Sequence, residues 1–406
     1  MPAARPDAQL LSAVLSGYRH AALAVSGGSD SMALLRLAAA SSPDLRISVL
    51  TVDHRLRPES SAEARQVGKW CSDLGLSHHI LAWTGANAGS GVQARARRAR
   101  YDLLTQWCRA QGAEALLTAH TLDDQAETVL MRMARTDSIA SLAGIPARGT
   151  WQGVALVRPL LDCRRADLRA YLERLGQGWI EDPSNDDRRF ERVRLRQMLP
   201  DLAASGVTPD RLAVLAKSCA VLTAQLEDCA RAWFRAALHQ DDGFCRFDLS
   251  AFDMLPRLLR QRILAELVRH FGGGSDPERA EIDRLDRSLG GKTGLRRTLG
   301  GALIWRRGGD VLIGREPGRL DPQPMPVPDT GELLWDGRYA VRAPPGSFVL
   351  PAPQAGLVRP SRAVPDTVFR TAPAILLRDG CLGDGPDGPG PVAMARFIPF
   401  RPSSGW

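Results

Sequence analysis

The residues best suited to chemistry form the turn Ser26-Gly27-Gly28-Ser29-Asp30-Ser31, which follows an apolar run and precedes a helix-like stretch. Glycine lets backbone N–H groups approach a phosphate closely, serine hydroxyls add donors, and a helix N-terminus adds positive potential. Because Asp30 is acidic, we expect a magnesium ion to bridge its carboxylate and the phosphates. The turn matches neither G-x-x-x-x-G-K-[ST] nor G-x-G-x-x-G, which argues against P-loop kinases and dinucleotide folds. The structural alternative is a strand–helix turn with a serine or aspartate N-cap.

A second reactive group is the string His120-Thr121-Leu122-Asp123-Asp124, followed by Glu127. Helical spacing places Asp123 or Asp124 beside Glu127, at i+4 or i+3. Grouped carboxylates can hold magnesium or the ammonium group of a ligand. The structural alternative is an acidic first turn that complements the helix dipole, with His120 as a core histidine.

Arginines form the third group. Arg97 and Arg100 lie at i,i+3, and we assign Arg97 to phosphate or substrate charge; a solvated basic face is the alternative. Ten arginines and eight acidic residues lie between positions 158 and 196. Spaced arginines with few bulky aromatics favour contact with a nucleic-acid backbone over base stacking, and internal salt bridges are the alternative. The predicted RNA contacts are Arg188, Arg189, Arg192, Arg194 and Arg196.

Alternating strands and helices must position these groups. Apolar runs at residues 21–25, 47–52, 79–83 and 115–119 predict buried parallel strands, with helices near 31–40, 62–74, 92–111 and 123–134. This alternation predicts an α/β fold with a doubly wound parallel sheet. Ligands bind at the carboxyl ends of such strands, where residues 26–31, 53–57 and 120–124 fall, so we expect one shared crevice.

The length of 406 residues predicts two or three domains. We place a catalytic domain at residues 1–205, a smaller helical or α+β substrate-binding domain at 206–316, and a Pro/Gly-rich C-terminal region of uncertain order at 317–406. Two short apolar runs around Gly309-Asp310 predict a hairpin. The composition of the tract GDGPDGPGP predicts a linker or a disordered segment.

Several motifs resemble known families. SGGSDS after an apolar strand resembles the loop of the PP-loop (N-type) ATP pyrophosphatases. VDHRLRPES, VQARARRARY, LLTAHTLDDQAETVL, LVRPLL, DPSNDDRRFERVRLR and TLGGALIWRRGGDVLIGRE resemble, in order, segments of tRNA(Ile)-lysidine synthetases. The resemblance covers about residues 18–316. Departures are Arg55 for a glycine, Thr121 for a second histidine, Thr136-Asp137 for a glycine after Arg135, and Val193 for an asparagine.

The resemblance implies an adenine nucleotide alpha hydrolase-like fold and a carbon–nitrogen ligase that needs ATP and Mg²⁺. Free L-lysine would be joined to C2 of cytidine 34 in tRNA(Ile) with a CAU anticodon, through an adenylated cytidine. The product, lysidine, would change decoding from AUG to AUA. The C2 oxygen would attack the α-phosphate of ATP, and the lysine ε-amine would then displace AMP.

The resemblance also implies roles for individual residues. Residues 26–31, Asp53 and His54 would bind ATP, Asp30 would hold Mg²⁺, and Asp124 and Glu127 would bind lysine. The implied catalytic residues are Asp30, Arg97, His120 and Asp124.

Composition narrows the alternatives. The seven cysteines include no C-x-x-C pair, which argues against a disulfide framework, a zinc site and an iron–sulfur cluster. A tRNA cytidine thiolase, which usually needs paired cysteines, and a non-catalytic RNA-binding relative are the rivals. The net charge of +8 favours a polyanionic partner, although a coding bias toward arginine would give the same balance. No signal peptide or spanning segment is evident, so we expect a cytoplasmic protein without a membrane partner; the oligomeric state, a homodimer included, stays open.

Overall fold

The computed structural model describes residues 6–41, 45–55, 59–83, 92–136, 138–181, 191–241, 243–291, 294–357, 365–377, 382 and 394–398. The chain divides into two compact units, residues 1–223 and 224–406, and the division falls within the long helix α9 (Pro209–Ala237). The domain boundaries given above stay predictions. No helix in the described part of the chain combines the length and apolar character needed to cross a membrane.

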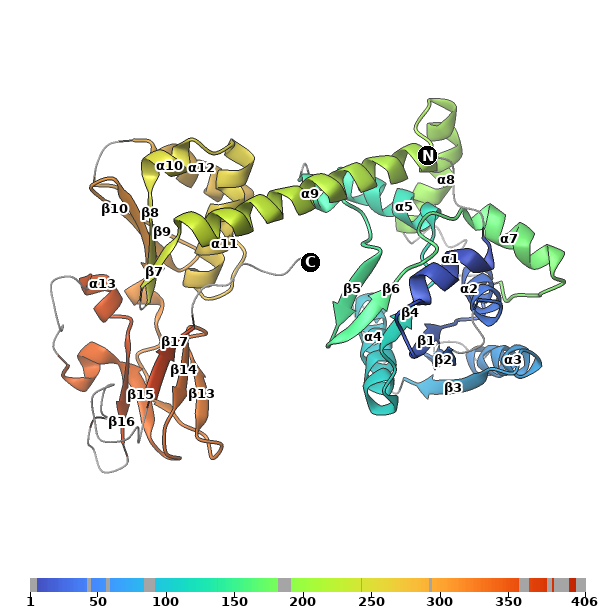
Figure 1. Ribbon diagram of the computed structural model, residues 1–406, viewed down its shortest axis with the longest axis horizontal. Coiled ribbons are helices and arrows are strands. Elements are labelled where there is room, and N and C mark those ends of the chain that lie inside the picture. The colour runs from blue at the N-terminus through green and yellow to red at the C-terminus, as the bar shows by residue number, and fades with distance from the viewer. Residues whose placement is uncertain are drawn as a thin grey trace. The chain divides into compact units, whose positions relative to one another are not determined.

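The first unit is built on a six-stranded sheet with the order β3-β2-β1-β4-β6-β5 (Figure 1). Its strands are β1 (His20–Ala24), β2 (Arg46–Asp53), β3 (Ser77–Ala82), β4 (Ala115–Leu117), β5 (Arg148–Trp151) and β6 (Val154–Val157). All neighbours run parallel except β5, which is antiparallel to β6 at one edge. The predicted α/β class and doubly wound parallel sheet are therefore confirmed.

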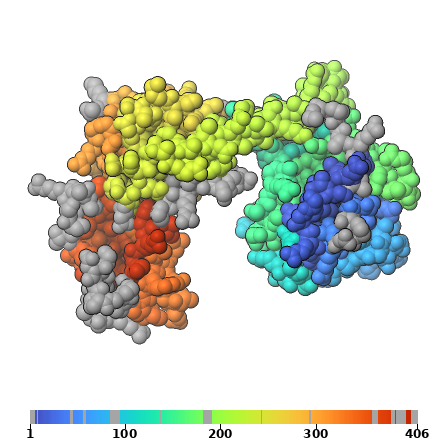
Figure 2. Space-filling model, in the orientation of Figure 1, coloured from blue at the N-terminus to red at the C-terminus, as the bar shows by residue number. Residues whose placement is uncertain are grey.

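Helices cover both faces of this sheet. Because side chains alternate along a strand, Ala21 and Leu23 of β1 enter one core with α1 (Ala8–Leu15), α2 (Ser29–Ala39), α3 (Ser60–Asp73) and α7 (Arg165–Arg174). Ala22 and Ala24 enter another core with α4 (Val92–Gln111). Around these lie α5 (Leu122–Met133), α6 (Ile139–Leu142) and α8 (Glu191–Ala204). In the space-filling view, dark blue atoms of the N-terminal part of the chain form part of this unit's outer surface (Figure 2).

The second unit begins with a five-stranded antiparallel sheet in the order β7-β8-β11-β10-β9. The strands are β7 (His239–Asp241), β8 (Phe244–Asp248), β9 (Arg296–Leu299), β10 (Ala302–Arg307) and β11 (Asp310–Arg315). The helices α10 (Leu249–Asp253), α11 (Arg257–Gly272) and α12 (Arg279–Leu289) pack against it. The predicted hairpin is confirmed, since Arg307 of β10 pairs with Asp310 of β11.

The C-terminal region contains two further three-stranded sheets, β12-β15-β16 and β13-β14-β17. Their strands are β12 (Met325–Pro326), β13 (Glu332–Trp335), β14 (Tyr339–Arg342), β15 (Phe348–Pro351), β16 (Pro373–Leu376) and β17 (Met394–Phe397). Short helical turns lie at η2 (Pro317–Arg319), η3 (Ala352–Ala355) and α13 (Asp366–Phe369). The tract predicted as a linker, residues 383–391, lies outside the described residues.

Candidate active site

The glycine-and-serine turn joins the end of β1 to the start of α2. Gly28 is the N-cap of α2 and no side chain caps this helix, so the alternative of a serine or aspartate N-cap is wrong. Gly27 has a φ of +94°, and a Cβ there would lie 2.6 Å from Cδ1 of Ile180. The Ser31 hydroxyl accepts a hydrogen bond from the Ser26 N–H at 3.2 Å and donates to the Gly28 carbonyl at 2.9 Å. Gly27 therefore allows the backbone conformation of the turn, and the hydrogen bonds of Ser31 stabilise it. The first N–H groups of α2, which have no partner within the helix, lie beside the turn.

Asp30 is the acidic residue of this turn, in the first helical turn of α2. Its Oδ2 accepts a hydrogen bond from Nε of Arg165 at 2.9 Å, and its Oδ1 accepts one from the Ser29 hydroxyl at 3.3 Å. Burial raises the pKa of Asp30, and the charge of Arg165 opposes this effect. The Oδ1 atom therefore keeps lone pairs for a further partner.

Three carboxylates at the start of α5 have three different surroundings. Asp123 accepts a hydrogen bond from the backbone N–H of Arg165 at 2.7 Å, which fixes the start of α7. Asp124 forms a capping box with Thr121, in which its Oδ2 accepts from the Thr121 N–H at 2.8 Å. Glu127 is only 1% exposed; its Oε1 accepts from Nε of Arg196 at 2.8 Å, while its buried Oε2 has no hydrogen-bond partner. The helix-capping alternative thus accounts for Asp124 in part and leaves Glu127 unexplained.

Arg165 is the residue that the motifs did not single out. Its guanidinium lies 2.9 Å from Asp30, 3.3 Å from Asp124 and 3.9 Å from Glu127, so it joins the turn to the carboxylates of α5. Burial acts to lower the pKa of Arg165, but these carboxylates outweigh it and raise the pKa. One sequence signal was available, because an arginine at the first position of a helix opposes the helix dipole and calls for a carboxylate nearby.

His120 follows β4 and lies near enough to Asp124 to feel its charge. Its Nδ1 is 3.0 Å from the Thr118 hydroxyl. Burial lowers the pKa of His120 to about 4; Asp124 opposes the shift, and the charges of Arg158 and Arg97 add to it. The imidazole is therefore neutral near pH 7 and can accept or donate one hydrogen bond.

The two arginines of α4 lie near enough to His120 to influence its charge. Arg97 is exposed, and its guanidinium stacks 5.5 Å from the ring centre of Tyr101. Arg100 is half-buried, and burial lowers the pKa of its guanidinium. His120 thus lies under the influence of both a carboxylate, Asp124, and the cations Arg97, Arg100 and Arg158.

This geometry agrees with the comparisons to known proteins. A PP-loop domain model, of the ATP-binding type, matches residues 4–202. A tRNA(Ile)-lysidine synthase of Methylobacterium nodulans is 44% identical over 307 residues, which is 73% of this chain and 90% of that protein. Those of Ruegeria pomeroyi and Bradyrhizobium diazoefficiens are 38% and 39% identical, over 80% and 78% of this chain and 77% and 96% of theirs. This chain belongs to the tRNA(Ile)-lysidine synthase family. The resemblance found in the motifs is therefore confirmed.

Two departures from the lysidine synthase pattern have clear structural accounts. Arg55, in place of a glycine, has a φ of +52°, so it adopts the left-handed conformation that glycine favours. Thr121, in place of a histidine, is the N-cap of α5. Val193, in place of an asparagine, is buried in α8, and Asp137 lies outside the described residues.

Asp53, the last residue of β2, and His54, the first residue after it, are assigned to ATP from the lysidine synthase motif. Both Asp53 oxygens are engaged, with the Ser60 hydroxyl at 2.7 Å and the Ser61 hydroxyl at 2.6 Å. Burial acts to raise the pKa of Asp53, but these hydrogen bonds outweigh it and lower the pKa. His54 packs edge-on against Trp83, and burial lowers its pKa. Asp53 therefore fixes its own loop, and the roles of both residues toward ATP stay predictions.

The arginines assigned to tRNA differ in their surroundings. Arg192 and Arg194 are exposed on α8, whereas Arg196 points inward to Glu127. Arg188 and Arg189 lie outside the described residues. The assignment of these five arginines to tRNA stays a prediction. Arg196 also forms an ion pair with Glu127 of the carboxylate group.

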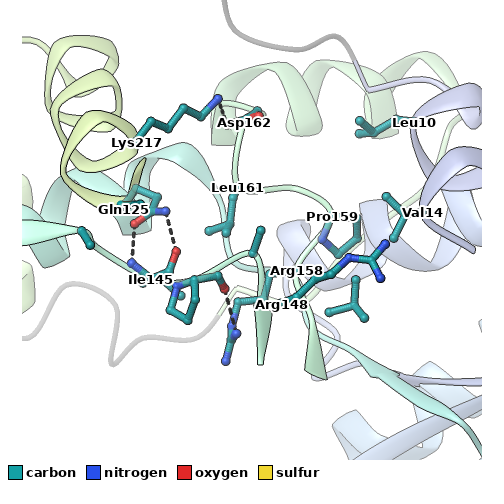
Figure 3. A pocket seen from close by; sticks show the side chains of 15 residues that line it. Leu10, Val14, Gln125, Ile145, Arg148, Arg158, Pro159, Leu161, Asp162 and Lys217 are labelled. Atoms are coloured by element: carbon teal, nitrogen blue, oxygen red, sulfur yellow. Dashed lines mark hydrogen bonds and ion pairs between the residues drawn. The ribbon is translucent and has the colours of Figure 1, made fainter. Parts of the chain in front are cut away.

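A separate cavity of about 330 Å³ lies in the same unit (Figure 3). Leu10 and Val14 of α1 line it together with Arg148 and Arg158, and the ion pair of Lys217 with Asp162, at 2.6 Å, lies at its edge. Neither the turn at residues 26–31 nor the carboxylates of Asp124 and Glu127 line this cavity. It is therefore distinct from the site that the lysidine synthase motifs form.

Proposed function

We propose that this protein catalyses ATP-dependent ligation of lysine to C2 of cytidine 34 in tRNA(Ile) with a CAU anticodon, giving lysidine. The names of the curated relatives support this activity. The observation that carries the proposal is the direct link, through Arg165, between the turn bearing Asp30 and the acidic pair Asp124 and Glu127. The proposed phosphate site and the proposed amine site are therefore bridged by a single guanidinium group, that of Arg165.

In the proposed first step, the C2 oxygen of cytidine attacks the α-phosphate of ATP and pyrophosphate leaves. The N–H groups at the start of α2 and the serine hydroxyls would hold phosphate oxygens. Arg97 would supply positive charge near His120 for the phosphates. The neutral imidazole of His120 can orient the base edge by a hydrogen bond without adding charge.

The residues present fit a magnesium ion at Asp30. Mg²⁺ is commonly held by one or two carboxylates together with substrate phosphates, and Asp30 Oδ1 has only the 3.3 Å contact to Ser29. No group of three or more histidines, cysteines or carboxylates suited to a metal occurs in the described ranges. When bound, the ion neutralises phosphate charge.

In the proposed second step, the ε-amine of lysine attacks C2 and AMP leaves. We assign the ammonium and amine recognition to Asp124 and Glu127, because the buried Oε2 of Glu127 has an unused acceptor position. The attacking amine must lose a proton, and the candidate bases are Asp124, Glu127 and His120, whose pKa burial lowers to about 4. Arg192 and Arg194, exposed on α8, are the described candidates for the tRNA backbone.

The test is incubation of the protein with ATP, isotopically labelled lysine and a CAU-anticodon tRNA(Ile), followed by mass analysis of the nucleosides. We expect lysidine in the reaction, none with Asp30→Ala, and wild-type amounts with Asp73→Ala, an exposed aspartate of α3. Product formation unaffected by Asp30→Ala would refute the assignment of the turn. A thiolated cytidine, or binding of tRNA without any turnover, would favour the two rival functions.

A further inference from the structure

One guanidinium is shared by carboxylates that the proposed function assigns to different substrates. Arg165 Nε contacts Asp30, its Nη2 contacts Asp124, and its Nη1 faces Glu127. These residues come from three elements, α7, α2 and α5. Among the described side chains, Arg165 alone forms ion pairs with both the turn at residues 26–31 and the acidic pair Asp124 and Glu127.

The backbone of Arg165 is held in place while its side chain is not enclosed. Its N–H donates to Asp123 at 2.7 Å, so the start of α7 is tied to the start of α5. Its side chain is 20% exposed to solvent, and an arginine side chain has several rotatable bonds, so the guanidinium has room to reorient. The anchor point is fixed and the charged end can change partners.

Charge balance shows what a change of partners would do. Three carboxylates (Asp30, Asp124 and Glu127) face two guanidiniums (Arg165 and Arg196), so the group carries one excess negative charge. If Arg165 turns toward added negative charge at the turn, Asp124 loses its cation and Glu127 keeps only Arg196. The acidic pair then becomes a stronger site for an ammonium group, because opposite charge nearby favours binding.

We propose that Arg165 couples the two substrate sites. Without nucleotide, Arg165 pairs with Asp124 and Glu127 and competes with lysine for them. When a nucleotide binds, Arg165 reorients toward its phosphates, and the lysine ammonium group binds the two carboxylates in its place. This inference rests on the proposed function and adds a direction to it, with nucleotide binding strengthening lysine binding. Arg165 is a positioning residue in this scheme. By thermodynamic reciprocity, lysine must strengthen nucleotide binding by the same factor.

The test is calorimetric titration of L-lysine into the full-length protein, with and without Mg²⁺ and an ATP analogue whose α,β-bridge is a methylene and resists cleavage. For the wild type we expect the nucleotide to lower the lysine Kd by a factor in the common coupling range, roughly 5- to 150-fold. For Arg165→Gln we expect tighter lysine binding without nucleotide and a ratio near one. A merely structural role would weaken both titrations and leave their ratio unchanged.

Two further variants keep the result interpretable. Arg164→Gln removes the neighbouring arginine, which pairs with Asp210 at 2.8 Å, and should keep the wild-type ratio. Arg165→Lys keeps the charge but cannot span three carboxylates, so its ratio should fall even if Arg165→Gln does not fold. A wild-type ratio of one or below, or an unchanged ratio in the Arg165 variants, overturns the coupling. Absence of lysine binding in every form would instead count against the proposed function.

Discussion

Glu127 offers the sharpest separation of function from stability. In Glu127→Gln the side chain keeps its shape and one oxygen that can accept from Arg196. It loses the negative charge that we propose for lysine binding. The buried Oε2 has no partner; an unsatisfied buried polar group costs about 1–3 kcal/mol, and more when it is charged, so replacing the carboxylate by a neutral amide lowers this cost. The ion pair with Arg196, a side chain 36% exposed, stabilises the fold by about 1 kcal/mol after solvent screening.

These two contributions are similar in size and opposite in sign. We therefore expect Glu127→Gln to change the free energy of unfolding by no more than about 1 kcal/mol. Removing one partner of a buried charge pair with a ligand costs about 2–5 kcal/mol, so the KM for lysine should rise at least about 30-fold. The variant would fold normally and fail to use lysine.

Urea unfolding followed by circular dichroism gives the stability, and lysine incorporation at varied lysine concentration gives the KM. Glu173→Gln, on the exposed face of α7, is the matched control and should leave both quantities unchanged. A loss of more than about 3 kcal/mol in Glu127→Gln would show that Glu127 is a structural residue, since broken buried pairs cost that much. An unchanged lysine KM would remove Glu127 from the lysine site.

Two other predictions follow from the turn and from His120. Gly27→Ala places a Cβ against Ile180 at a φ of +94°, so it should lower the free energy of unfolding by about 1–3 kcal/mol and weaken ATP binding in calorimetry. Gly75→Ala has a φ of +67° and open space around it, so it should destabilise the fold and leave ATP binding intact. For His120 the unfolded chain takes up a proton near pH 6.5, whereas burial lowers the pKa in the folded state to about 4. The stability that comes from the neutral imidazole is thus present above pH 6.5 and is lost as the pH falls toward 4. At about 1.4 kcal/mol per pKa unit, the free energy of unfolding of the wild type should fall over this range by roughly 3 kcal/mol more than that of His120→Gln. Parallel pH profiles of the two proteins in urea unfolding would refute this prediction.

The sequence was most informative where periodicity and local motifs coincide. The four predicted strands of the first unit correspond to β1 to β4, and β1, β2 and β4 are the buried apolar runs that are typical of parallel strands. The predicted burial of β3 is wrong, because this strand lies at the edge of the sheet and is largely exposed. The strands β5 and β6, four residues each at the edge of the sheet, are too short to stand out from the surrounding loops. The strands after residue 317 are also two to four residues long and lie among prolines and glycines, which conceal them.

The site was predictable in its motifs and not in its connections. Local spacing gave the turn around Asp30 and the pair Asp124 and Glu127. Spacing could not pair Arg165 with Asp30, 135 residues away, because that contact depends on where α7 meets α2. For the same reason Arg196 was assigned to tRNA from its basic neighbours, while its inward contact with Glu127 depends on how α8 packs.

The capping box at the start of α5 has a consequence for how this protein could vary. Asp124 uses Oδ2 to cap the start of the helix, and its Oδ1 accepts a hydrogen bond from Arg165. A Thr121→Val exchange would remove the hydroxyl that contacts the Asp124 N–H and Oδ2, and would fray the first turn, while the Thr121 N–H would still donate to Oδ2. A substitution at position 121 would therefore disturb the start of α5 and, through it, the position of the Asp124 carboxylate that we propose for lysine.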